Sequence, residues 1–113
     1  MTFPKQEPVT VQIEGRVNWS VARDEHDGHL FGVCRELNLM ASGDDLNDFL
    51  QCANESVALL LQSLLKHGEL ESFLRNMGWR SVTPLPSRDV PARFVVLPFN
   101  VDRVHRDELL VRA

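Results

Sequence analysis

Apolar and polar residues alternate strictly near the start of the chain. The apolar side chains fall on odd positions: Val9, Val11, Ile13, Val17, Trp19 and Val21. Polar residues fill the even positions from Thr10 to Ser20. A period of two predicts a strand with one buried face and one solvated face. Gly15 interrupts the apolar face, which predicts a bulge or bend, and therefore one long kinked strand or two shorter ones.

A hairpin and two further strands are predicted next. The turn 24–29 contains Asp27-Gly28, a pair that tolerates the positive φ angles of tight hairpins. Residues 30–35 are apolar on both faces, as expected for a strand at the centre of the sheet or covered on both sides. The alternation of Leu37, Leu39 and Ala41 predicts a short third strand.

A long amphipathic helix should follow these strands. Asp44 and Asp45 are suitable N-cap residues, and apolar residues recur with a helical period from Leu46 to Leu64. Gly68 suits the end of the helix. The apolar stripe is wider than one three-stranded sheet requires, so we expect part of it to cover a second subunit.

The remaining chain predicts a short helix and one more strand. Residues 69–77 form the helix, and Trp79 is expected to fold back as an apolar anchor. Residues 80–92 contain three prolines and are interpreted as a connector. A strand follows, with Val95, Leu97, Phe99 and Val101 predicted on one face. Pro98 has no N–H to donate, so this strand belongs at a sheet edge or a bulge.

These elements predict an α+β fold of order β-β-β-α-α with an extra C-terminal strand. A small antiparallel three-stranded sheet packs against one long and one short helix. We divide the chain into a flexible arm (1–8), a folded domain (9–79), the connector (80–92) and a C-terminal strand and tail (93–113). At 113 residues the chain is long enough for one domain.

Composition narrows the classes of function. The net charge of −4 argues against a general nucleic-acid surface and is compatible with a basic protein partner. The N-terminus has no apolar signal segment, and no apolar run approaches the length of a membrane span. We therefore expect a cytoplasmic protein without membrane contact. Cys34 and Cys52 do not have a metal-site spacing and are interpreted as free thiols.

Candidate catalytic groups have simpler structural interpretations. Asp24, Asp44, Asp45 and Asp48 would be the carboxylates of a metal-dependent nuclease, but acidic residues at a helix start commonly cap it. The pair His26 and His29 lacks the further ligands that zinc needs. The six glycines form no phosphate-binding loop. We expect no enzymatic activity, no catalytic or metal-binding residues and no cofactor.

The C-terminal strand offers the best candidates for a binding surface. Phe94 and Phe99 follow a long connector and have no evident local core to join. We therefore predict a partner or subunit interface at four residues of this strand: Phe94, Val96, Phe99 and Val101. The expected assembly is a homodimer or a higher homo-oligomer, with the tail strand pairing to a neighbouring subunit.

Residues 16–79 resemble the HicB-like antitoxin family. The similarity lies in an acidic-Gly turn, a following strand, a small-residue–Gly–Asp step into a helix and a closing Gly-aromatic pair. These are Asp24-Glu25-His26-Asp27-Gly28, Phe31 to Leu39, Ala41-Ser42-Gly43-Asp44 with Ala53, Glu55 and Ala58, and Gly78-Trp79. The chain departs from the family at Cys34 to Met40, where a Pro-x-Leu-Pro-Gly turn is usual, and at Asp48-Phe49, where Glu-Ala is frequent.

The resemblance implies a partial ribonuclease-H-like fold in a distant family member. It also implies a non-enzymatic, protein-binding module that neutralises a small, basic, mRNA-cleaving toxin. Residues 93–113 are too short for the family's usual DNA-reading domain, so DNA binding is not expected from this chain. An orphan homo-oligomeric binding module of the same fold is the main alternative, and a metal-dependent nuclease is the third.

Overall fold

The computed structural model describes residues 8–105 and has the predicted α+β class. Its strands are β1 (Val9–Arg23), β2 (Leu30–Cys34), β3 (Leu39–Gly43), β4 (Arg80–Ser81) and β5 (Ala92–Arg103). Its helices are α1 (Leu46–Lys66) and α2 (Leu70–Met77). Residues 1–7 of the predicted arm and 106–113 of the predicted tail lie outside the described range.

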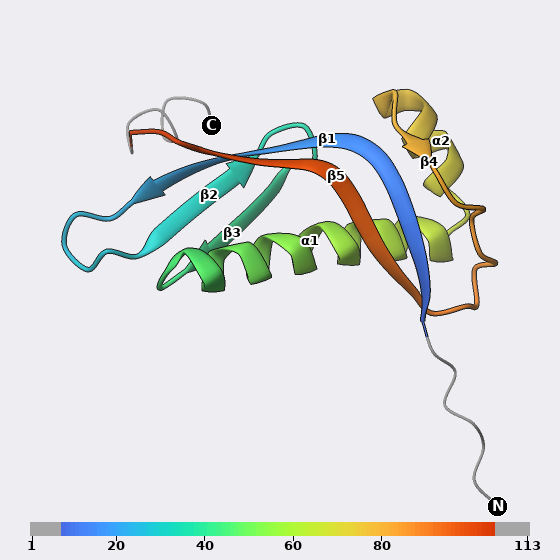
Figure 1. Cartoon of the computed structure of the whole chain (residues 1–113), viewed down its shortest axis with the longest axis horizontal. Helices are drawn as coiled ribbons and strands as arrows, with labels where there is room; N and C mark the ends of the chain where they lie inside the picture. Colours follow the sequence, from blue (N-terminus) through green and yellow to red (C-terminus); the bar gives the residue numbers. More distant parts are fainter. Residues whose placement is uncertain (1–7, 106–113) are drawn as a thin grey trace, which may run out of the picture.

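The strand β1 is the centre of the sheet. Its C-terminal half pairs antiparallel with β2, which in turn pairs antiparallel with β3, as the sequence predicts. Its N-terminal half pairs antiparallel with β4 through Ile13 and Glu14. The strand β5 runs parallel to β1 over almost its whole length, from Val9 to Val21 (Figure 1). The complete sheet is therefore mixed rather than purely antiparallel.

The kink predicted at Gly15 is a bulge within one continuous strand. The register between β1 and β5 shifts between Glu14 and Val17, so two residues of β1 lie opposite one residue of β5. The missing side chain at Gly15 makes room for Trp79, because a Cβ there would lie 2.3 Å from the indole Cδ2. Trp79 is buried, as the anchor role predicts.

The core lies between the sheet and α1. The buried residues of β1 in this core are Val11, Ile13, Val17, Trp19 and Val21. The buried side of the helix presents Phe49, Ala53, Val57, Leu61 and Leu65. Trp19 and Phe49 form an edge contact with ring centroids 5.7 Å apart. The side chain of Asp45 caps the helix by accepting a hydrogen bond from the backbone N–H of Asp48 at 2.8 Å.

Two details of the predicted C-terminal half are wrong. Arg80 and Ser81, assigned to the connector, form the short strand β4. The predicted shared face of Val95, Leu97, Phe99 and Val101 does not exist, because the alternation changes by one residue at Pro98. The residues of β5 that pack against the core are Ala92, Phe94, Val96, Phe99 and Val101.

The far end of the sheet is closed by α2. Gly78 ends this helix with a φ of 70°, a left-handed conformation that glycine adopts without strain. The pair α2 and β4 lies at the opposite end of the molecule from the β1–β2 hairpin (Figure 1). No helix among residues 8–105 has both the length and the apolar character needed to cross a membrane.

Candidate interface along β5 and the adjoining sheet surface

The strand β5 has one backbone edge that no strand of residues 8–105 occupies, since it pairs only with β1. In a parallel ladder, the residues whose N–H and C=O groups point at the neighbour alternate with those that point away. The N–H of Val9 donates to the carbonyl of Pro91 at 2.9 Å, and the N–H of Val104 donates to that of Val21 at 2.9 Å. The backbone carbonyl of Pro91 and the backbone N–H of Val104 therefore point toward β1.

Alternation from these two anchors identifies the groups on the free edge. Counting forward from Pro91, the backbones of Phe94 and Val96 point away from β1. Counting back from Val104, so do those of Phe99 and Val101. The count from Pro91 and the count from Val104 agree only because the alternation changes by one residue at Pro98. The N–H of Ala92, also on this edge, donates to Oε1 of Gln62 at 3.4 Å.

The four predicted interface residues therefore have two roles in the structure. Their side chains pack on the core of their own chain, and Val96 is buried while the other three are half-buried. The premise that Phe94 and Phe99 have no local core to join is wrong, because β5 returns to β1 of the same chain. Their backbone groups, rather than their side chains, face the free edge.

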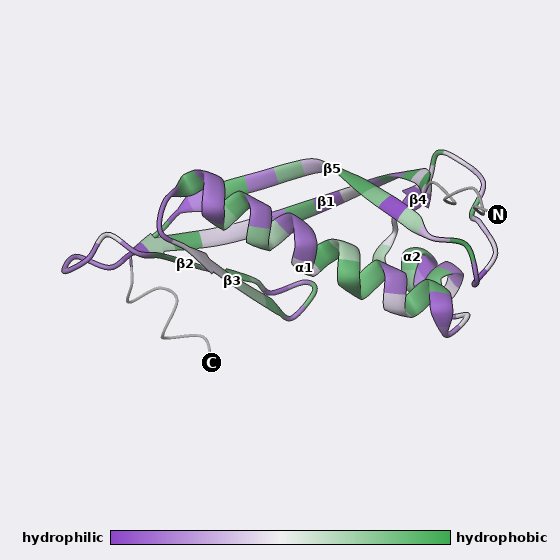
Figure 2. Ribbon diagram, turned by 90° about the horizontal axis from the view of Figure 1, so that it is seen from below, coloured by the Kyte–Doolittle hydropathy of each residue, from purple (hydrophilic) through white to green (hydrophobic). Residues whose placement is uncertain are grey.

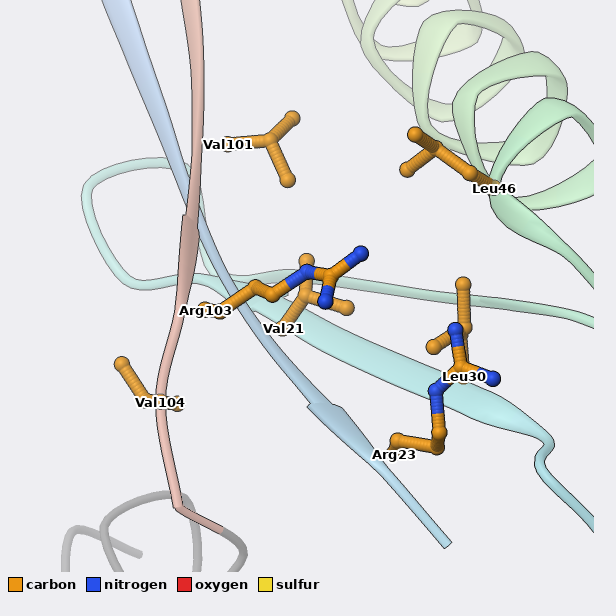
Figure 3. Close-up of a pocket in the computed structure, with 7 residues that line it drawn as sticks. All are labelled: Val21, Arg23, Leu30, Leu46, Val101, Arg103 and Val104. Atoms are coloured by element: carbon orange, nitrogen blue, oxygen red, sulfur yellow. The ribbon is translucent and has the colours of Figure 1, made fainter.

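A small pocket lies where β5 ends beside the start of α1. It has a volume of about 120 Å³. Its lining is apolar apart from two arginines: Val21, Arg23, Leu30, Leu46, Val101, Arg103 and Val104. Figure 3 shows the arginine side chains reaching into the space among these apolar groups. Neither guanidinium forms an ion pair with another residue of the described part of the chain.

The hairpin turn and the start of α1 together form an acidic end of the molecule. They meet through Nδ1 of His29, which lies 3.0 Å from Oδ1 of Asp44. Side-chain oxygens of Asp24 and Asp27 accept hydrogen bonds from the backbone N–H groups of His26 and His29. Of the four carboxylates considered for a nuclease, Asp24 accepts a hydrogen bond within the turn, Asp44 contacts His29 and Asp45 caps α1. Within residues 8–105, no three His, Cys, Asp or Glu side chains gather in an arrangement that would hold a metal.

The face of the sheet opposite α1 carries exposed apolar side chains. Phe31 is 47% exposed and Met40 is 76% exposed. Val33 lies directly opposite Met40 in the β2–β3 ladder and two residues from Phe31, so the three share this face. The prediction of a second strand at the centre of the sheet is confirmed, while its outer face is open within the described chain. Figure 2, seen from the side of α1, shows β2 and β3 running beside the helix, with their open face turned away from the viewer.

Hydrogen bonds connect this open face to β5. Nδ2 of Asn100 donates to Oδ1 of Asn18 at 3.0 Å, and Nδ2 of Asn18 donates to Oε1 of Glu36 at 3.1 Å. The Sγ of Cys34 donates to the other oxygen of Glu36 at 3.3 Å. Burial raises the pKa of the Cys34 thiol to about 11, and the neighbouring Glu36 also raises it.

Sequence reasoning found the strand that carries the free edge but not the exposed pair on β2 and β3. The signal for Phe31 is the apolar pattern on both faces of residues 30–35, a pattern that is equally typical of a strand covered on both sides. Both cysteines are free, as predicted, with Cys34 buried and Cys52 half-buried. In comparisons with known proteins, no family model, no curated protein and no solved structure matches this chain.

Proposed function

We propose that this protein is a non-enzymatic, HicB-like antitoxin-type module that binds a small basic protein, an mRNA-cleaving toxin. The observation that carries the proposal is the exposed apolar surface of Phe31, Val33 and Met40 beside the acidic end. An exposed apolar patch bordered by polar and charged residues is typical of protein-binding surfaces.

Charge favours a basic partner at this surface. The hairpin 24–29 and the start of α1 place six carboxylates at one end of the molecule: Asp24, Glu25, Asp27, Asp44, Asp45 and Asp48. The side chain of Asp44 is 88% exposed. A protein that binds RNA carries clustered Lys and Arg, so complementary charge would speed its docking here. The resemblance of residues 16–79 to HicB-like antitoxins supports the same class of partner.

The test is co-purification with the basic protein encoded beside this one, followed by an mRNA-cleavage assay of that protein. We expect a stoichiometric complex and loss of cleavage when the complex forms. Met40→Asp should weaken binding by at least about tenfold, because it places a charge in the apolar contact. Val82→Asp is the matched control, since Val82 is 51% exposed but lies outside this face, and it should bind as the wild type does.

Two results would contradict the proposal. A neighbouring basic protein that neither binds nor loses its nuclease activity would leave the orphan homo-oligomeric module as the better description. Equal binding by Met40→Asp and the wild-type protein would remove the β2–β3 surface as the contact. The metal-dependent nuclease has no observation among the described residues in its favour.

A further inference from the structure

We propose that two copies of this chain pair edge to edge through β5, antiparallel and about a two-fold axis at the Leu97–Pro98 bond. The partner is a second copy of the chain, and the pairing joins two sheets into one continuous sheet. It uses a different surface from the proposed toxin contact and does not depend on it.

The first argument is the matching of backbone groups. Antiparallel strands form their hydrogen-bonded pairs between residues whose N–H and C=O groups face each other. The four edge-facing residues nearest Pro98 are Phe94 and Val96 before it, and Phe99 and Val101 after it; Ala92 faces the same edge, but its N–H already donates to Gln62. An axis at Leu97–Pro98 places Phe94 opposite Val101 of the second copy, and Val96 opposite Phe99 of the second copy. Each edge-facing group then meets another edge-facing group.

The second argument is the matching of side-chain faces. Residues directly opposite each other in a sheet project their side chains to the same face. All four edge-facing residues pack on the side of the sheet that α1 covers. The pairing therefore continues one apolar face across both copies. Without the change of alternation at Pro98, an axis between residues 97 and 98 would place each edge-facing residue opposite one that faces β1.

Charge selects this register over its neighbours. Arg93 and Asp102 are both exposed, and neither has an ion pair or a side-chain hydrogen bond within residues 8–105. In the proposed register each Arg93 lies opposite Asp102 of the other copy, so two opposite-charge pairs form. Moving the axis by one residue in either direction places Arg93 opposite Asn100 or Val104 instead, and both charge pairs are lost.

The flank of α1 supports the same assembly. Gln62 reaches the edge of β5 at Ala92, and Leu59 lies one helical turn earlier on the same flank. Leu59 is 71% exposed, so its side chain is available for contact with a second copy. Joining the two edges would bring this flank toward that of the second α1. The part of the apolar stripe of α1 that its own sheet does not need would then pack against the second copy.

Charge reversal gives the test, with molar mass measured by analytical ultracentrifugation across a concentration series. The wild type should be a dimer, and Arg93→Asp or Asp102→Arg alone should weaken dimerisation by about tenfold, because both pairs become repulsive. An equimolar mixture of the two variants should restore dimers, since every pair is then attractive. Arg75→Glu is the matched control. Arg75 is exposed on α2, away from β5, and this variant should dimerise as the wild type does.

Cysteine cross-linking tests the register itself. Positions 93 and 102 would form a non-hydrogen-bonded pair with Cα atoms about 4.5 Å apart, which suits a disulfide. Mixed Arg93→Cys and Asp102→Cys proteins should cross-link on oxidation, whereas Arg93→Cys with Asn100→Cys should not. A monomeric wild type, a dimer insensitive to both reversals, or preferential cross-linking at position 100 would each overturn the proposal. If the free edge of β5 binds a different protein instead, the purified wild type should be monomeric.

Discussion

Gly15 and Trp79 illustrate how one absent side chain fixes a local arrangement. The indole of Trp79 lies over Gly15, where an added Cβ would approach three of its ring atoms to less than 3 Å. The ring also makes an edge contact with Phe73, with centroids 5.8 Å apart. The bulge of β1, the strand β4 and the helix α2 therefore meet at a single close contact.

We predict that Gly15→Ala destabilises the protein by about 1–3 kcal/mol, because the methyl group overpacks against the indole. Urea unfolding followed by far-UV circular dichroism measures the change. In a Trp79→Ala background the same substitution should cost much less, since the colliding ring is gone. Equal costs in the two backgrounds would show that the indole is not what excludes a side chain at residue 15.

The elements differ in how much of their structure is encoded locally. The strand β1 and the helix α1 are predictable because their periods of two and 3.6 are long and regular. The strand β4 has two residues and no period, so only its pairing with Ile13 and Glu14 reveals it. The parallel pairing of β5 depends on residues 9–21, far away in the sequence, and no local pattern contains it.

The edge-facing backbone of β5 was equally hidden from the sequence. The sequence predicts an interface at these residues through their side chains, whereas in the structure those side chains pack on the core. Whether a backbone N–H points to a free edge depends on which strand lies beside it. That neighbour is set by tertiary pairing and cannot be read from the local sequence. The change of alternation at Pro98 is likewise a property of the paired strand.

The strand β5 should be indispensable to the fold rather than a removable tail. A chain ending at residue 91 would leave the inner edge of β1 without its ladder and uncover Val11, Val17 and Trp19, which are fully buried. We expect that chain to lose its cooperative urea transition, whereas a chain ending at residue 105 keeps it. A sharp transition in the shorter chain would show that the residues up to 91 suffice for cooperative folding.

At the scale of the whole molecule, the two proposed contacts lie on separate surfaces. The molecule is elongated, with principal extents of 53 × 38 × 21 Å, and the acidic hairpin lies at the end away from α2. The proposed toxin contact would use the open face of β2 and β3, while the proposed contact between copies would use the outer edge of β5. One chain therefore has room to bind a second copy and a partner at the same time.

Stability should vary with pH through two groups near the β2–β3 turn. The pKa of Cys34 is raised from 9.0 to about 11 by burial, so its stabilising contribution is complete below pH 9.0 and is lost as the pH rises through 11. Burial alone would raise the pKa of Glu36, but its backbone hydrogen bond and those from Asn18 and Cys34 lower it below 4.5. Its contribution is present above pH 4.5 and is lost as the pH falls through the lowered value.

Urea unfolding at a series of pH values measures both effects. Cys34→Ala should flatten the alkaline decline in unfolding free energy, and Glu36→Gln should flatten the acid decline. Cys52→Ala serves as the thiol control and should leave the alkaline decline unchanged. An alkaline decline of equal slope in Cys34→Ala and the wild type would assign it to other groups.

The parallel pairing of β1 and β5 also has a consequence for the order of events during synthesis. The ribosome makes β1 first, yet two of the three strands that pair with it, β4 and β5, are made only after both helices. Until residues 92–103 have emerged, the growing chain carries a half-paired strand with an open apolar face, a state prone to pairing with other nascent chains. Closure of the sheet is thus a late, long-range step, and the nascent chain must be kept from its neighbours until that step occurs.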